Sequence, residues 1–251
     1  MDDFYKSFNR SVFGDIDCDS PDKHKPADLV LGSSDNDSNY EMNGGTVMAL
    51  AGGDFVLLAG DTRLSSDNYI LSREQTKLFK MTPTAVFASS GAWCDVIALK
   101  SQLEMRIQLY ELEHKKTIST ESLAHLISMM MYDHRFSPYY TCTILAGLDS
   151  KGKGAVYYYD PVGSYERVRY RVVGTSYALL LPCLDVFYGW ENNRLTPPLK
   201  DEDLTMTMAV RMARNCLFIA SDRDIYSGDM GELLSVTSEG MKSSTIKLRA
   251  D

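Results

Sequence analysis

The stretch Thr46-Val-Met-Ala-Leu-Ala-Gly-Gly-Asp-Phe-Val-Leu-Leu-Ala59 decides the fold class of this chain. It holds two short apolar runs, 47–51 and 55–59, on either side of Gly52-Gly53-Asp54. A glycine-rich triplet between apolar runs is typical of a tight turn. The stretch therefore predicts a hairpin of two buried strands.

Apolar patterning outside the hairpin predicts further strands at 84–88, 141–148, 155–160, 165–173, 233–237 and 245–248. One helical face is predicted by spacings of three or four between Val96, Leu99, Leu103, Ile107 and Tyr110. A second helix starts after the N-cap candidate Ser119, and two more fit 175–188 and 203–220. This order is not a strict β-α alternation. It predicts an α+β fold, a four-layer αββα sandwich of two antiparallel sheets flanked by helices.

Composition and charge exclude several function classes. The 251 residues are 44% hydrophobic and 24% charged, with a net charge of −8, which argues against a nucleic-acid-binding surface. No run approaches the roughly 18 apolar residues of a membrane helix, and the charged N-terminus does not resemble a secretory signal. Five dispersed cysteines suit free thiols in a reducing compartment. Without a His-x-x-x-His or Cys-x-x-Cys pair, no metal or other cofactor is expected.

The acidic charge is concentrated at the N-terminus. Residues 1–44 hold ten Asp/Glu against four Lys/Arg, and 32–38 read Gly-Ser-Ser-Asp-Asn-Asp-Ser. Such a segment buries too little apolar surface to offset its ordering entropy. We therefore expect 1–43 to be an acidic flexible leader and 44–251 to be the folded domain.

Asp61, Arg63 and Lys77 are the first candidates for chemistry. Asp61 ends an apolar strand, and Lys77 adjoins Leu78-Phe79. An apolar setting lowers a lysine pKa and suits the group for proton transfer. Taken singly, each of the three residues fits a surface or ion-pair role better.

Four motifs together carry a family resemblance. Gly44-Gly-Thr-Val47, Ala59-Gly-Asp-Thr-Arg63, Ser89-Ser-Gly91 and Asp222-Arg-Asp-Ile-Tyr-Ser-Gly-Asp229 occur in the order and spacing of proteasome β subunits. The similarity runs from about Asn43 to the C-terminus. The segments 135–140, 146–149, 152–157 and 160–167 resemble in particular the subunit at the sixth position of the β ring (beta-6 type).

The resemblance implies the N-terminal nucleophile hydrolase fold and a place in the 28-subunit 20S core particle. There a heteroheptameric β ring lies against an α ring and the opposite β ring, and unfolded proteins are degraded in the enclosed chamber by the ATP- and ubiquitin-dependent pathway. Neither a nucleic acid nor a membrane is an expected partner. Cytoplasm and nucleus are the expected locations.

Active members of the family use an N-terminal threonine, whose hydroxyl attacks the peptide carbonyl and whose α-amine is the base. The resemblance places the supporting residues at Asp61, Lys77, Asp224 and Ser227. In active members the threonine precedes the aspartate by as many residues as the lysine follows it, which points here to Gly45. Glycine has no hydroxyl, so the subunit is expected to be non-catalytic.

The competing interpretation makes Thr46 the nucleophile of an active peptidase cut after Gly45. An extra residue accommodated at Gly52-Gly53 would restore its register. Against this, Val47 follows where active subunits usually carry a second threonine or serine, and a one-residue shift turns a side chain to the opposite face of a strand. A free-standing hydrolase of small amides is disfavoured by the beta-6 segments.

Overall fold

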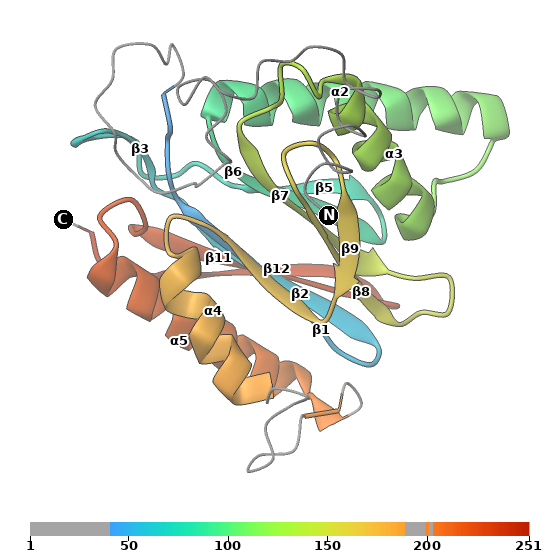
Figure 1. Ribbon diagram of the computed structural model, residues 1–251. Coiled ribbons are helices and arrows are strands. Elements are labelled where there is room, and N and C mark those ends of the chain that lie inside the picture. Colours follow the sequence, from blue (N-terminus) through green and yellow to red (C-terminus); the bar gives the residue numbers. More distant parts are fainter. Residues whose placement is uncertain (1–40, 189–198, 201–202, 251) are drawn as a thin grey trace, which may run out of the picture. The chain divides into compact units, whose positions relative to one another are not determined.

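The computed structural model (Figure 1) describes residues 41–188, 199–200 and 203–250. The predicted hairpin is present: β1 (Thr46–Ala51) pairs antiparallel with β2 (Phe55–Asp61). Its register runs without a break from Val47↔Gly60 to Ala51↔Val56. The turn is closed by a hydrogen bond of 2.8 Å from the amide of Gly52 to the carbonyl of Phe55.

This hairpin is the centre of a five-stranded antiparallel sheet in the order β10-β1-β2-β11-β12. The three further strands are β10 (Tyr170–Gly174), β11 (Met230–Thr237) and β12 (Gly240–Lys247). A second five-stranded antiparallel sheet has the order β5-β6-β7-β8-β9. Its strands are β5 (Leu78–Thr82), β6 (Ala85–Gly91), β7 (Thr141–Leu148), β8 (Gly154–Tyr159) and β9 (Tyr165–Val168). A small ribbon pairs β3 (Leu64–Ser66) with β4 (Tyr69–Ser72).

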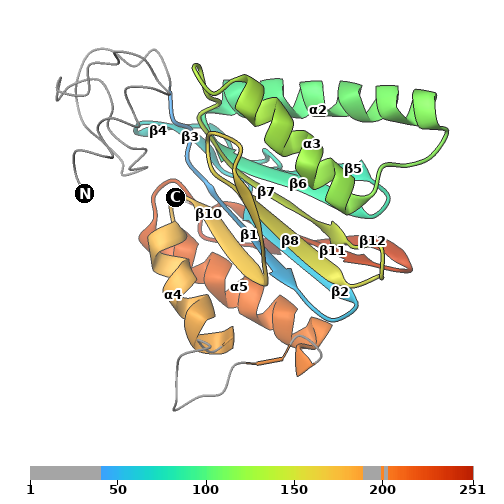
Figure 2. The same cartoon turned by 45° about the vertical axis from the view of Figure 1, so that its right-hand side comes forward.

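Helices cover the outer face of each sheet, as Figures 1 and 2 show. Helices α2 (Trp93–His114) and α3 (Thr120–Asp133) pack on the second sheet, and α4 (Tyr177–Tyr188) and α5 (Met206–Arg223) pack on the first. The predicted N-cap Ser119 is confirmed, because its side chain accepts a hydrogen bond from the amide of Ser122. The four-layer αββα sandwich is therefore the fold. No described helix is long and apolar enough to span a membrane.

Three apolar clusters hold the layers together. In β1, Val47 and Ala49 face the second sheet, whereas Met48 and Leu50 face α4 and α5. Because successive strand residues point to opposite faces, a strand buried on both faces must be apolar throughout. The continuous apolar runs of the hairpin reflect this position between two layers.

The structure corrects one predicted strand and adds three. The predicted strand 165–173 is two strands in different sheets: Val168 pairs with Val156 in the second sheet, and Tyr170 pairs with Leu50 in the first. The chain crosses between the sheets at Arg169, whose carbonyl already accepts from the amide of Ala51 at 2.7 Å. The strands β3, β4 and β5 were not predicted, since the first two are very short and β5 alternates with an exposed Lys80.

Candidate functional site

The candidate site lies where β1 begins and β2 ends. Asp61, the last residue of β2, is 1% exposed, and its carboxylate accepts four hydrogen bonds. The donors are the amide of Thr46 (2.7 Å), the amide of Arg63 (3.0 Å), the amide of Gly228 (3.2 Å) and the ammonium of Lys77 (3.1 Å). Donors directed at a carboxylate stabilise its charged form. This geometry is therefore that of a buried ion pair.

Lys77 is the cationic partner of that ion pair and is also 1% exposed. Its Nζ donates to the carbonyl of Asp61 (3.0 Å), to Asp61 Oδ1 (3.1 Å) and to the carbonyl of Arg63 (2.6 Å). An ammonium has three donors, so all are used. Burial lowers the pKa of Lys77 and raises the pKa of Asp61, while the attraction between the two charges opposes both shifts. The lowered lysine pKa agrees in direction with the expectation from its apolar surroundings.

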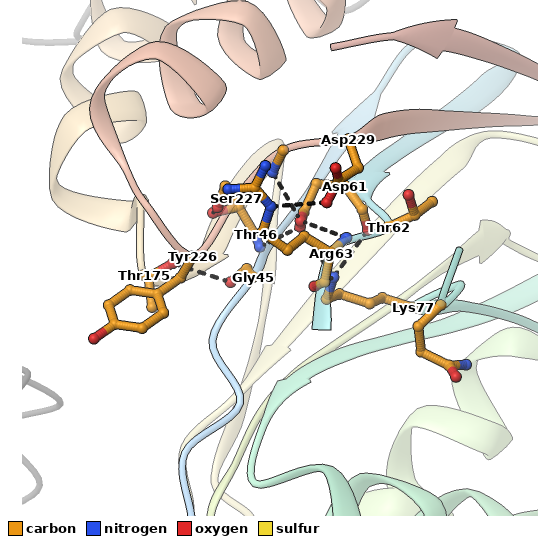
Figure 3. A network of polar contacts seen from close by, with 12 residues as sticks. Gly45, Thr46, Asp61, Thr62, Arg63, Lys77, Thr175, Tyr226, Ser227 and Asp229 are labelled. Carbon is orange, nitrogen blue, oxygen red and sulfur yellow. Dashed lines mark hydrogen bonds and ion pairs between the residues drawn. The ribbon is translucent and has the colours of Figure 1, made fainter. Parts of the chain in front are cut away.

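Gly45 lies directly against this lysine (Figure 3). A Cβ atom built on Gly45 would be 2.2 Å from Lys77 Cε, 2.7 Å from Lys77 Nζ and 3.1 Å from Asp61 Oδ1. The backbone of Gly45 has φ +88, a conformation that favours glycine. Its carbonyl accepts a hydrogen bond from the amide of Thr175 at 3.1 Å. The side-chain position of residue 45 therefore points at the ion pair.

The Thr46 hydroxyl belongs to a different cluster. Thr46 is 0% exposed; its Oγ1 lies 2.8 Å from the Oγ of Ser227 and accepts from the amide of Ser176 at 3.2 Å. Ser227 Oγ in turn donates to Asp224 Oδ2 at 2.8 Å. With its only hydrogen committed to Asp224, Ser227 accepts from Thr46. The four residues form a hydrogen-bonded chain beside the ion pair.

Asp224 accepts hydrogen bonds from several hydroxyl groups of this cluster. Its Oδ2 accepts from the hydroxyls of Thr175, Ser176 and Ser227, and its Oδ1 accepts from the amide of Tyr226. The sequence pattern does not indicate Thr175 and Ser176 as site residues, because it fits a helix that starts at 175. Helix α4 begins at Tyr177, which leaves both hydroxyls in the connection from β10.

Arg63 contacts the ion pair through its carbonyl and a neighbouring loop through its side chain. It is 4% exposed, and its Nε donates to Asp229 Oδ2 at 2.8 Å. Its Nη1 donates to the carbonyl of Ile225 at 2.9 Å. These bonds connect the loop after α5 to the segment that follows β2. Arg63 and Asp229 both belong to the sequence motifs quoted above, but only the fold brings these two residues into contact.

The structure brings the candidate residues of the sequence analysis together in two clusters that meet at the start of β1. These residues are Gly45, Thr46, Asp61, Lys77, Asp224 and Ser227. Among the residues that the structure describes, no group of three or more His, Cys, Asp and Glu could hold a metal ion.

Comparison with known proteins identifies the family. The family model described as "Proteasome subunit" matches residues 41–236. "Proteasome subunit beta type-1" of Drosophila melanogaster is 45% identical over 214 residues, covering 85% of this chain and 91% of the relative. The protein of the same name from Arabidopsis thaliana is 40% identical over 217 residues, covering 86% and 97%. "Proteasome subunit beta type-6" of Saccharomyces cerevisiae is 38% identical over 220 residues, covering 84% and 90%. The chain therefore belongs to the proteasome subunit family, as a β-type subunit.

Proposed function

We propose that this chain is a structural β subunit of the 20S proteasome core that contributes no peptidase activity of its own. The observation that carries the proposal is the position of Gly45. The Cβ direction of residue 45 points at the Lys77 side chain, which supports an attacking position at a residue without a hydroxyl. Without a nucleophile no acyl-enzyme forms.

The continuous pairing of β1 with β2 supports this assignment. An extra residue in the hairpin would appear either as a bulge, where two residues of one strand oppose one residue of the other, or as a longer turn. The register from Val47↔Gly60 to Ala51↔Val56 has no bulge, and the turn beyond it holds only Gly53 and Asp54 between the bonded residues Gly52 and Phe55. A compensating insertion at Gly52-Gly53, which would move Thr46 into the attacking position, is therefore disfavoured.

One observation favours the alternative, an active peptidase with Thr46 as nucleophile after cleavage at Gly45. The chain from Thr46 through Ser227 to Asp224 could carry a proton from the threonine hydroxyl to a carboxylate. Two facts oppose it: Thr46 is 0% exposed, and the three donors of the Lys77 ammonium go to Asp61 and Arg63 rather than to the Thr46 hydroxyl.

The proposed role is to complete the heteroheptameric β ring and to line the chamber in which unfolded proteins are degraded. The partners are the other β subunits, the α ring and the opposite β ring, and the location is cytoplasm and nucleus. Large apolar side chains exposed on the isolated chain, including Leu112, Phe136 and Val186, suit burial against such neighbours. The relatives carry both type-1 and type-6 names, and the segments 135–140 and 160–167 lead us to propose the sixth ring position.

The test uses assembled core particles. The subunit is analysed by intact mass and N-terminal sequencing after treatment with a threonine-directed covalent inhibitor. We expect residues before Gly45 to remain attached and the inhibitor to add no mass to this subunit. A mature chain that begins at Thr46 and carries the inhibitor would overturn the proposal.

A pair of substitutions at Thr46 gives an independent readout. In particles carrying Thr46→Ala, all peptidase activities should stay at the level of particles carrying Thr46→Ser, which keeps the hydroxyl. The alanine variant loses the bonds to Ser227 and Ser176, so the subunit itself should be destabilised by about 1–3 kcal/mol. Selective loss of one peptidase activity with Thr46→Ala alone would favour the catalytic alternative.

A further inference from the structure

Asn43, which the sequence placed in the leader, is bonded to the domain through every polar group it has. It is 6% exposed. Its amide donates to the carbonyl of Gly91 at 3.0 Å, and its carbonyl accepts from both the amide and the hydroxyl of Ser65 at 3.3 Å. Its Nδ2 donates to the carbonyl of Ser65 at 3.0 Å, and its Oδ1 accepts from the amide of Trp93 at 2.8 Å. These five bonds join three separate parts of the chain.

The bond to Trp93 replaces a missing helix cap. Helix α2 begins at Trp93, and its N-cap residue is Ala92, which has no side chain able to accept a hydrogen bond. The first amides of a helix need acceptors from outside the helix, and a side-chain cap contributes about 0.5–2 kcal/mol. Here the cap comes from Asn43, fifty positions earlier in the sequence. The start of α2 thus depends on a residue that lies before the expected domain boundary.

Accessibility changes sharply at this residue. Glu41 is exposed and Met42 is 39% exposed, whereas Asn43, Gly44, Gly45 and Thr46 are all buried. A protease needs an accessible, flexible segment to bind. Cleavage after Asn43 or Gly44 would also leave Ser65, Gly91 and Trp93 without their hydrogen-bond partners once the leader departed. Such unpaired buried groups are costly.

We propose that Asn43 is an internal anchor that stops proteolytic trimming of the leader, so that the shortest stable subunit begins at or before Asn43. This inference rests on the proposed function, because an active subunit would have to be cut before its nucleophile. The anchor acts through the side chain: it holds the segment 43–45 against the domain while it caps α2.

The test is trimming of assembled particles by a non-specific protease, followed by intact mass of the subunit. For the unmodified chain and for the control Met42→Ala, we expect the shortest product to retain Asn43. With Asn43→Ala, trimming should continue beyond residue 43, so that the shortest products lack it. Hydrogen exchange in the peptide 89–96 should also become faster, because the cap on Trp93 is gone. Asn43→Asp keeps an acceptor for Trp93 but replaces the donor to the Ser65 carbonyl, so its exchange in 89–96 should stay slower than that of Asn43→Ala.

Trimming of the unmodified chain beyond Asn43, or identical end points for the unmodified chain and Asn43→Ala, would overturn the inference. If the alanine variant fails to assemble, hydrogen exchange of the unmodified subunit decides: fast exchange at Asn43 and in 89–96 would count against the anchor. Failure of the proposed function gives a different signal, namely inhibitor mass on a chain that begins at Thr46. A chain that lacks the label but is trimmed past Asn43 contradicts the anchor alone.

Discussion

Replacing Gly45 with alanine should destabilise the subunit far more than the same replacement at Gly152. Both glycines have positive φ, +88 and +74, so either substitution carries the conformational cost of a left-handed backbone, about 1–2 kcal/mol. A Cβ on Gly152 meets no atom within 4 Å. A Cβ on Gly45 would overlap Lys77 Cε at 2.2 Å. The difference between the two variants therefore isolates the effect on Lys77.

The end of a lysine side chain usually moves aside at little cost, but here it is held. Lys77 is buried, and its Nζ uses all three donors on the acceptors of Asp61 and Arg63. Displacing it would break a buried ion pair, which costs about 3–5 kcal/mol. We expect Gly45→Ala to lose at least about 2 kcal/mol more than Gly152→Ala.

The stability of both variants is measured by urea unfolding of the full chain, with circular dichroism as the signal. The change in unfolding free energy is the shift in the urea concentration at the midpoint, multiplied by the m-value, which is the slope of the unfolding free energy against urea concentration. The double variant Gly45→Ala with Lys77→Ala should lose less than the sum of the two single variants, since the overlapping atoms are then absent. Equal destabilisation of the two glycine variants, within about 0.5 kcal/mol, would refute the placement of Gly45 against Lys77.

Two further predictions concern buried ionisable groups. Lys77→Met should destabilise the chain by about 3–5 kcal/mol because it leaves the Asp61 carboxylate without its cation, and the pair Lys77→Met with Asp61→Asn should be less destabilised in urea than Lys77→Met alone. A double variant that loses as much as the two single variants together would contradict an ion-pair role. Burial raises the pKa of the Cys142 thiol from 9.0 to about 11, so the stability this group contributes is fully present below pH 9.0 and is lost as the pH rises through about 11. Unfolding free energies measured across that range should fall less for Cys142→Ala than for the unmodified chain or for Cys94→Ala, which removes an exposed thiol.

Much of the fold could be predicted because the central strands β1, β2, β6, β7 and β8 are apolar and almost wholly buried on both faces. The runs at 47–51 and 55–59 lie between a helical layer and a second sheet, so their burial is visible in composition alone. The crossing at Arg169 was not predictable in this way, since alternation along a strand does not specify its partner. The same limit explains Thr175 and Ser176, whose role depends on Asp224, a residue almost fifty positions away.

The sequence by itself determined that residue 45 carries no hydroxyl, and the spacing of Asp61 and Lys77, together with the family resemblance, pointed to that residue over Thr46. Whether the spacing corresponds to a real contact was decided only by the tertiary structure. The Cβ position of Gly45 points at the Lys77 side chain, and pairing with Ser227 takes the Thr46 hydroxyl into another cluster. Asn43 likewise belongs to the domain only through bonds to residues 22 to 50 positions away. Such contacts arise from chain folding, and local sequence patterns carry no record of them.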